Sequence, residues 1–104
     1  MKASVRTQPE ADEQARAIED WWRVNRPAAP NLFTHELAAA FALLSGAPLA
    51  GRRYSARSIP GLRRVMLPSS RYHVYYVYDG EHGEVNVLAI WSAVRGKGPP
   101  LRRP

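Results

Sequence analysis

The chain has 104 residues, of which 45% are hydrophobic and 23% are charged, and this composition is typical of one folded domain rather than of a disordered chain. It contains no cysteine, which excludes a disulfide framework and a thiolate metal site. The net charge of +6 is uneven, because residues 1–50 hold five basic and six acidic side chains whereas residues 51–104 hold ten and three. The positive half predicts a polyanion or an acidic protein as partner, and a solvated basic surface is an equal alternative.

The N-terminal segment MKASVRTQPEADEQ lacks the apolar core of a signal peptide. The chain has no apolar run of about 18 residues, the length that a membrane span needs. We therefore expect a cytosolic protein without a membrane partner. Three histidines without carboxylates at matching spacing predict no metal site, and we expect no cofactor.

The first elements are an edge strand over residues 2–7 and a helix within residues 8–27. Pro9 suits the first position of the helix, and Pro27 ends it. Neighbouring residues on a helix differ in direction by about 100°, so Trp21 points away from the apolar stripe. The stripe has the spacing of one helix face and consists of Ala11, Ala15, Ile18 and Trp22.

A second helix is predicted over residues 31–46, with Asn31 as N-cap and Gly46 in the left-handed position after its end. Its apolar stripe consists of Phe33, Leu37, Phe41 and Leu44. The short linker RPAAP predicts that the two helices form an antiparallel hairpin.

Residues 46–61 are rich in Gly, Pro, Ser and Arg and are predicted to form a loop. The hydrophobic period then becomes two, which predicts strands in LRRVMLP, RYHVYYVYD and VNVLAIWSAV. A basic tail rich in Pro and Gly follows at residues 95–104. The order β-α-α-β-β-β predicts a single α+β domain over residues 1–104, in which the helix hairpin covers one face of a small antiparallel sheet.

The segment RYHVYYVYDG raises the question of which aromatic side chains face the helices. We expect Tyr72, Val74, Tyr76 and Tyr78 to face the core under the helices. Arg71, His73, Tyr75 and Val77 then point to an open face. On the last strand the same alternation places Leu88 and Ile90 on one side, and Val87, Ala89 and Trp91 on the other.

Several segments together resemble the RelE/ParE family of bacterial type II toxins. They are the helix ending in AIEDWW, the helix FTHELAAAFALL, the phrase GAPLAGR, the segment IPGLRRVMLPSSRYHVYYVYD and the strand VNVLAIWSAVRG. The order and spacing of these segments over about 90 residues carry the resemblance, because no single motif among them is diagnostic.

The resemblance implies a toxin neutralised by an antitoxin encoded beside it, with a helix hairpin on a small sheet. In the RelE branch the toxin cuts mRNA in the ribosomal A site, and in the ParE branch it poisons DNA gyrase. The resemblance further implies a hetero-oligomer with the antitoxin, whose tail wraps around the toxin. A ribbon-helix-helix antitoxin with an acidic amphipathic tail is the usual partner of the ParE branch.

A metal-independent ribonuclease needs a base, cations for the phosphate and an acid for the leaving oxygen. The residues that match or could replace the RelE-like set are Arg63, Arg64, Tyr72, His73 and Arg95. After Arg95 the tail offers no Tyr or His, so this set looks incomplete. The sequence therefore favours a gyrase inhibitor over the alternative, a ribosome-dependent endoribonuclease. A binding module without toxicity, retained as an antitoxin partner, is a third possibility.

Two further sets of residues are candidates for binding, and each also has a purely structural alternative. For the antitoxin, the candidates are the basic and amphipathic side chains Arg63, Arg64, Arg71, Tyr75, Trp91 and Arg95. Arg63 and Arg64 are adjacent on a strand and alternate faces, so one of them should lie on the open side. For the target, the exposed tryptophan and the basic tail suggest Trp21, Arg95, Lys97, Arg102 and Arg103.

Overall fold

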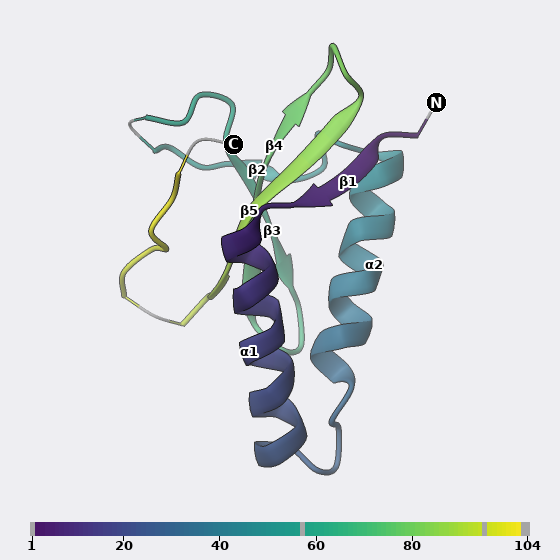
Figure 1. Ribbon diagram of the computed structural model, residues 1–104, viewed down its shortest axis with the longest axis vertical. Helices are drawn as coiled ribbons and strands as arrows, with labels where there is room; N and C mark the ends of the chain where they lie inside the picture. The colour runs from purple at the N-terminus through teal and green to yellow at the C-terminus, as the bar shows by residue number, and fades with distance from the viewer. Residues whose placement is uncertain (1, 57, 95, 103–104) are drawn as a thin grey trace.

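The computed structural model describes residues 2–56, 58–94 and 96–102, and within them two helices lie on one face of a five-stranded sheet (Figure 1). The strand order is β1-β5-β4-β3-β2. The predicted α+β class, with a helix hairpin on one face of the sheet, is confirmed. The elements are β1 (Ser4–Thr7), α1 (Pro9–Asn25), α2 (Leu32–Gly46), β2 (Arg52–Arg53), β3 (Arg63–Leu67), β4 (Tyr72–Asp79) and β5 (Glu84–Ser92).

The two helices are antiparallel and lie side by side, as their short connection predicts (Figure 1). Helix α1 begins at Pro9 and carries Glu10 and Asp12 in its first turn, where the helix dipole favours acidic side chains. Trp22 is buried whereas 44% of Trp21 is exposed, so the predicted direction of each tryptophan is confirmed.

Helix α2 differs from the prediction at its end. Gly46 lies within the last turn instead of after it, and it is not among the glycines with positive φ. Ala47 caps the helix, and its N–H donates to the carbonyl oxygen of Leu43 at 2.7 Å. Asn31 occupies the N-cap position as predicted, without a side-chain cap hydrogen bond. The buried stripe of α2 consists of Phe33, Leu37, Ala40 and Leu44.

Strands β3, β4 and β5 form the predicted antiparallel meander, but the sheet is mixed because β1 pairs in parallel with β5. A parallel neighbour requires a crossover connection, and here almost the whole chain lies between the two strands. A second difference is β2, which lies within the predicted loop. Its two residues, Arg52 and Arg53, pair with Arg64 and Arg63 at the edge of the sheet.

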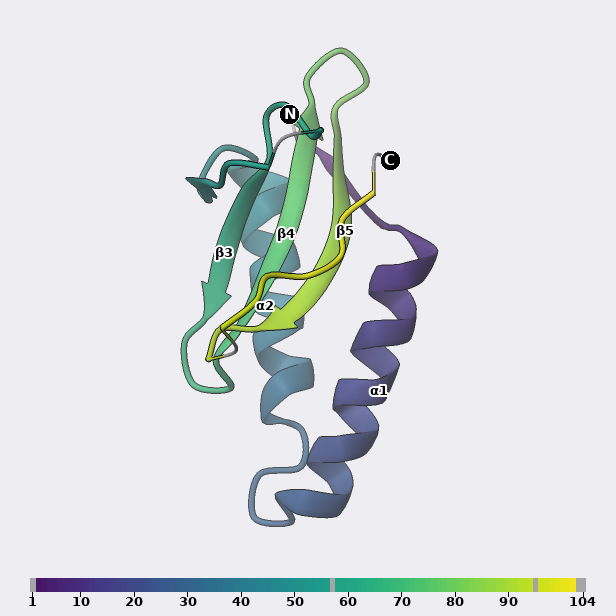
Figure 2. The same cartoon turned by 90° about the vertical axis from the view of Figure 1, so that its left-hand side faces the viewer.

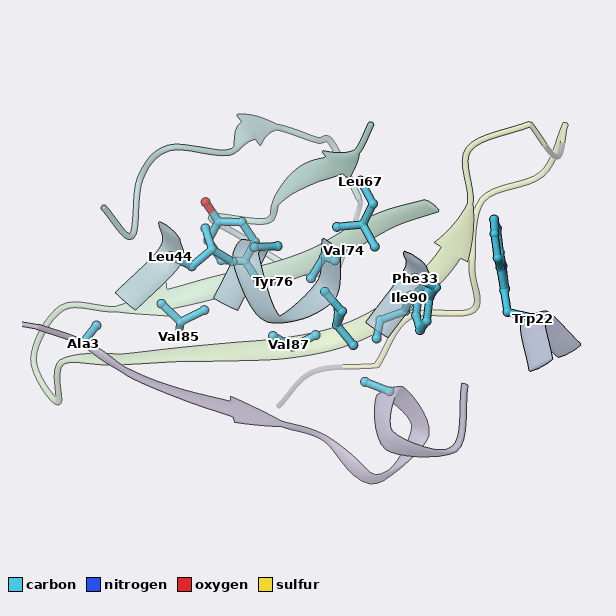
Figure 3. Close-up of a cluster of buried hydrophobic side chains, with 13 residues drawn as sticks. Ala3, Trp22, Phe33, Leu44, Leu67, Val74, Tyr76, Val85, Val87 and Ile90 are labelled. Carbon is cyan, nitrogen blue, oxygen red and sulfur yellow. The ribbon is translucent and has the colours of Figure 1, made fainter. Parts of the chain in front are cut away.

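The main core lies between the helices and the sheet (Figure 3). Val74 and Tyr76 are fully buried there, and Tyr72 and Tyr78 pack against it, so the predicted inward side of β4 is confirmed. The alternation predicted for β5 is wrong. A β-bulge between Tyr75 and Tyr76 breaks the register, which pairs Tyr75 with Ala89 and Tyr76 with Val87. As a result, Val87 and Ile90 belong to the helix-side core, whereas Leu88 and Ala89 belong to a cluster on the other face.

The face of the sheet opposite the helices, called the second face below, is covered by side chains of the 54–62 loop and by the C-terminal tail (Figure 2). The expectation of an open face is therefore wrong over Tyr75, of which only 2% is exposed. Composition gave no sign of this cover, because the loop and the tail reach the strands only through tertiary contacts. The buried members of this second-face cluster are Ile59, Leu62, Tyr75, Leu88 and Ala89.

Candidate functional site

Arg64 and two tyrosines form the centre of the second face. The guanidinium carbon of Arg64 lies 4.6 Å from the centre of the Tyr54 ring, and its Nη1 donates to the hydroxyl of Tyr75 at 3.2 Å. The two tyrosine rings meet edge to face, 5.1 Å apart. Among the described residues no carboxylate forms an ion pair with Arg64. This arrangement holds a cation by aromatic contacts and leaves its charge uncompensated by an acid.

His73 lies beside this group on β4, with its ring 5.9 Å from that of Tyr75. Partial burial of the imidazole and the positive charge of Arg64 lower the pKa of His73. The neutral imidazole is therefore the favoured form near pH 7.

Arg63 points to the opposite side of the sheet from Arg64, as their adjacent positions predict. Its Nη1 donates to the carbonyl oxygens of Gly51 at 2.7 Å and Leu49 at 3.2 Å, so it holds the segment that leads into β2. Tyr72 also faces the helices, where its ring meets that of Phe33 at 5.2 Å.

The structure does not bring the predicted nuclease residues together. Arg64 and His73 lie on the second face, while Arg63 and Tyr72 lie on the helix side. Arg95 lies outside the described residues. Among the described members of this set, Arg64 and His73 therefore share one face, and the sheet separates them from Arg63 and Tyr72, whereas acid–base cleavage of RNA needs its groups on one side.

The C-terminal tail lies across the second face (Figure 2). The Nε1 of Trp91 donates to the carbonyl oxygen of Lys97 at 3.0 Å, and Leu101 packs against the second-face cluster. Gly98 passes so close to Tyr54 that an added Cβ would lie 2.8 Å from the tyrosine hydroxyl. These contacts give residues 96–102 of the tail a defined position although they have no regular secondary structure.

The predicted antitoxin contacts have three different environments. Arg71 is exposed in the β3–β4 turn. Among the described residues it is the one residue other than glycine with a positive φ, of 64°. Trp91 is half-buried under the tail, and Tyr75 is buried beneath Tyr54 and Arg64. Of the described members of the predicted set, Arg71 is thus the most accessible to a partner, and Tyr75 is inaccessible beneath its neighbours.

The predicted target contacts lie on two sides of the molecule. Trp21 lines a hollow of about 550 Å³ between α1 and β5, together with Ile18, Trp91 and Val94. Arg26 lies over its ring at 5.1 Å. Lys97 and Arg102 are exposed on the tail, and Arg103 lies outside the described residues.

A groove between α2 and β3 was not found from the sequence. It has a volume of about 260 Å³, and its walls include Leu43 and Met66, which are 49% and 46% exposed. Strand β2 pairs only with Arg63 and Arg64. It therefore does not cover the part of the β3 edge that lies beside this groove. The one available signal was Leu43, an apolar residue outside the predicted stripe of α2.

The β4–β5 hairpin holds the one group of possible metal ligands among residues 2–56, 58–94 and 96–102. It consists of Asp79, Glu81 and His82. The Asp79 carboxylate bonds to the His82 ring at 2.7 Å and accepts hydrogen bonds from the backbone N–H groups of Glu81 and His82. These hydrogen bonds within the turn explain why the three residues lie close together. In the described part of the chain, no helix combines the length and apolar character of a membrane span.

Comparison with known proteins identifies relatives of this fold. A family model described as "ParE toxin of type II toxin-antitoxin system, parDE" matches residues 5–95. No significant match was found among curated proteins. A chain of the chromosomal ParDE system of P. aeruginosa superposes with a TM-score of 0.69 and 18% identity, covering 88% of this chain and 96% of that one. A chain of the RelBE2 toxin–antitoxin complex of Mycobacterium tuberculosis superposes with a TM-score of 0.66 and 21% identity, covering 88% of this chain and 99% of that one. A mutant of E. coli RelE in the free state superposes with a TM-score of 0.55 and 20% identity, covering 90% of this chain and 86% of that one.

Proposed function

The chain belongs to the ParE toxin family of type II toxin–antitoxin systems, and from this premise we propose that it inhibits DNA gyrase and is neutralised by a cognate antitoxin. One observation carries the choice of gyrase over mRNA cleavage. The predicted nuclease side chains are divided between the two faces of the sheet: Arg64 and His73 share the second face, whereas on the helix side Arg63 is bound to loop carbonyls and Tyr72 packs on Phe33. This proposal places the site of action in the cytoplasm.

Two assays on the purified protein test the choice of target. We expect inhibition of DNA supercoiling, with gyrase–DNA cleavage complexes trapped, and no codon-phased cuts in mRNA in a translating extract. Adding the co-purified antitoxin should restore supercoiling. Codon-phased mRNA cuts with gyrase unaffected would overturn the proposal in favour of the ribosome-dependent endoribonuclease. Unchanged growth under strong induction, with neither activity, would leave a binding module without toxicity.

The groove between α2 and β3 supports the antitoxin as partner. Arg52 and Arg53 are exposed at this edge of the sheet, and Leu43 and the half-buried Val65 offer apolar contacts in the groove. An acidic amphipathic segment fits both features, because an extended peptide can add to a free strand edge while its side chains fill the groove. We propose this edge as the main contact of the antitoxin tail, with Arg71 as a further charged contact at the β3–β4 turn.

Leu43→Glu tests this placement. The substitution puts a carboxylate into the groove and should weaken antitoxin binding on the order of tenfold or more, measured by calorimetric titration. Val24→Glu is the matched control, because Val24 is also an exposed aliphatic residue on a helix and is 78% exposed on α1. Equal antitoxin affinity of the two variants would contradict the proposed contact.

A further inference from the structure

The second face carries a group of cations without acidic partners. Arg52 lies directly opposite Arg64 in the β2–β3 pair, so their side chains share the face that also holds Tyr75. The tail, which lies over the same face, adds the exposed Lys97 and Arg102 (Figure 2). None of these four side chains forms an ion pair among the described residues.

The carboxylates of the neighbouring strands do not compensate these cations. Asp79 and Glu84 lie at the end of the β4–β5 hairpin, where Asp79 bonds to His82 and Glu84 bonds to Arg6. Among the described residues, the charged side chains in the middle of the second face are thus all positive, and such a surface attracts a polyanion.

The aromatic side chains of this face distinguish one class of polyanion from another. Proteins that bind single strands stack bases on exposed aromatic rings. Here Tyr75 is buried, Gly98 of the tail lies against Tyr54, and Trp91 is half-buried with its Nε1 bonded to Lys97. The docked tail therefore restricts the access of bases to these rings. What remains accessible is a set of cations suited to phosphates, and duplex DNA presents phosphates with its bases already stacked.

We propose that the second face and the docked tail together form a surface that binds the phosphate backbone of duplex DNA. The choice of DNA rests on the proposed function, since gyrase acts on duplex DNA. The tail has two parts in this surface: it supplies Lys97 and Arg102, and it covers the aromatic rings that would otherwise favour single strands. Contact to phosphates alone predicts binding without base specificity.

A charge-reversal variant tests the cations. The probe is a fluorescently labelled 20-base-pair DNA duplex, and its binding to the full chain is followed by anisotropy at several salt concentrations. Lys97→Glu with Arg102→Glu should weaken binding about tenfold or more and make the logarithmic salt dependence less steep by about two. Arg16→Glu with Arg23→Glu makes the same change in net charge on the exposed side of α1, and should have a much smaller effect.

A second variant tests whether the tail must be docked. Gly98→Val with Leu101→Ser removes two anchors of the tail and keeps every cation. Loss of the hydrogen bond from the Trp91 indole, seen as a shift of its N–H resonance, reports release of the tail. We expect duplex affinity to fall about fivefold or more. An affinity equal to that of the native chain would show that the cations of an undocked tail are sufficient for binding. That result would overturn the proposal that the second face and the docked tail form one surface.

The failures of the two proposals are distinguishable, because the anisotropy experiment contains no gyrase. Duplex binding that depends on Lys97 and Arg102 would support this surface even if gyrase were not the target. Absence of salt-dependent duplex binding, or tighter binding of a single-stranded RNA of equal length by the native chain, would overturn it whatever the supercoiling assay shows.

Discussion

Replacing Gly51 by alanine is expected to lower the free energy of unfolding by about 3 kcal/mol. An added Cβ would lie 2.6 Å from the hydroxyl oxygen of Tyr76 and 2.9 Å from the carbonyl oxygen of Arg64. The Tyr76 side chain has no free space into which it can turn, since it is fully buried in the core under the helices. Its hydroxyl also accepts the N–H of Gly51 at 2.8 Å, and the substitution would disturb that bond in a buried place.

Urea unfolding followed by circular dichroism measures this loss. Gly46→Ala is the matched control, because a Cβ at Gly46 meets nothing within 4 Å and the residue lies in the last turn of α2. Alanine is favoured over glycine in a helix, so the control should leave stability unchanged or raise it by up to about 1 kcal/mol. A change below about 0.5 kcal/mol for Gly51→Ala would contradict the close contact with Tyr76.

The contact at Gly51 also illustrates which parts of the fold a sequence pattern can predict. The helices and the three main strands were predicted because each depends on a local period. Ala11 and Trp22 recur with the helical spacing, and Val74 and Tyr76 alternate with the strand spacing. The pairing of a two-residue β2 with β3 depends instead on a glycine that allows the backbone to approach Tyr76. Such a contact has no period in the sequence.

The prediction of the second face failed for two physical reasons. The bulge at Tyr75–Tyr76 changes which residues of β5 face the helices, and a strand pattern assumes unbroken alternation. Gly98 of the tail lies against Tyr54, whose ring meets that of Tyr75, and Leu101 packs against the cluster that contains Tyr75. Both tail residues follow β5 in the chain and are therefore distant from Tyr75 in sequence. A composition rich in Pro and Gly predicts irregular backbone but not where that backbone lies.

The candidate site was predicted in its residue types more than in its arrangement. The opposite directions of Arg63 and Arg64 follow from strand geometry and are confirmed. The loop carbonyls that bind Arg63 and the Tyr54 ring that lies against Arg64 belong to the 49–54 segment, which was predicted only as a loop. The positions of Tyr72 and His73 on opposite faces then separate the nuclease candidates that the sequence alone left as one set.

Glu36 connects α2 to the β3–β4 turn. Its carboxylate accepts the N–H of Ser69 at 2.9 Å, the N–H of Ser70 at 2.8 Å and the hydroxyl of Ser70 at 2.7 Å. These bonds hold the two residues that precede Arg71, whose positive φ is unfavourable for a residue with a side chain. Glu36→Ala should therefore lower the free energy of unfolding by about 2 kcal/mol at pH 7.

The effect of Glu36→Ala should depend on pH in a defined direction. Partial burial acts to raise the pKa of Glu36, but the hydrogen bonds from Ser70 and Ser69 outweigh it and hold the pKa below its usual value. A carboxyl group with a lowered pKa in the folded state stabilises the protein fully above its unfolded pKa, and this contribution is lost as the pH falls through the folded value. The difference between Glu36→Ala and the native chain should thus be constant from about pH 7 to 5 and shrink towards pH 3.

Urea unfolding at pH 7, 5 and 3 measures this dependence, with Glu13→Ala as control, since Glu13 is exposed on α1. The control should change stability by less than about 0.5 kcal/mol at each pH. A loss for Glu36→Ala that stays constant down to pH 3 would mean that the charged carboxylate does not hold the turn. A loss that shrinks with acidity would show that the ionised side chain of α2 sets the geometry in which Arg71 is presented.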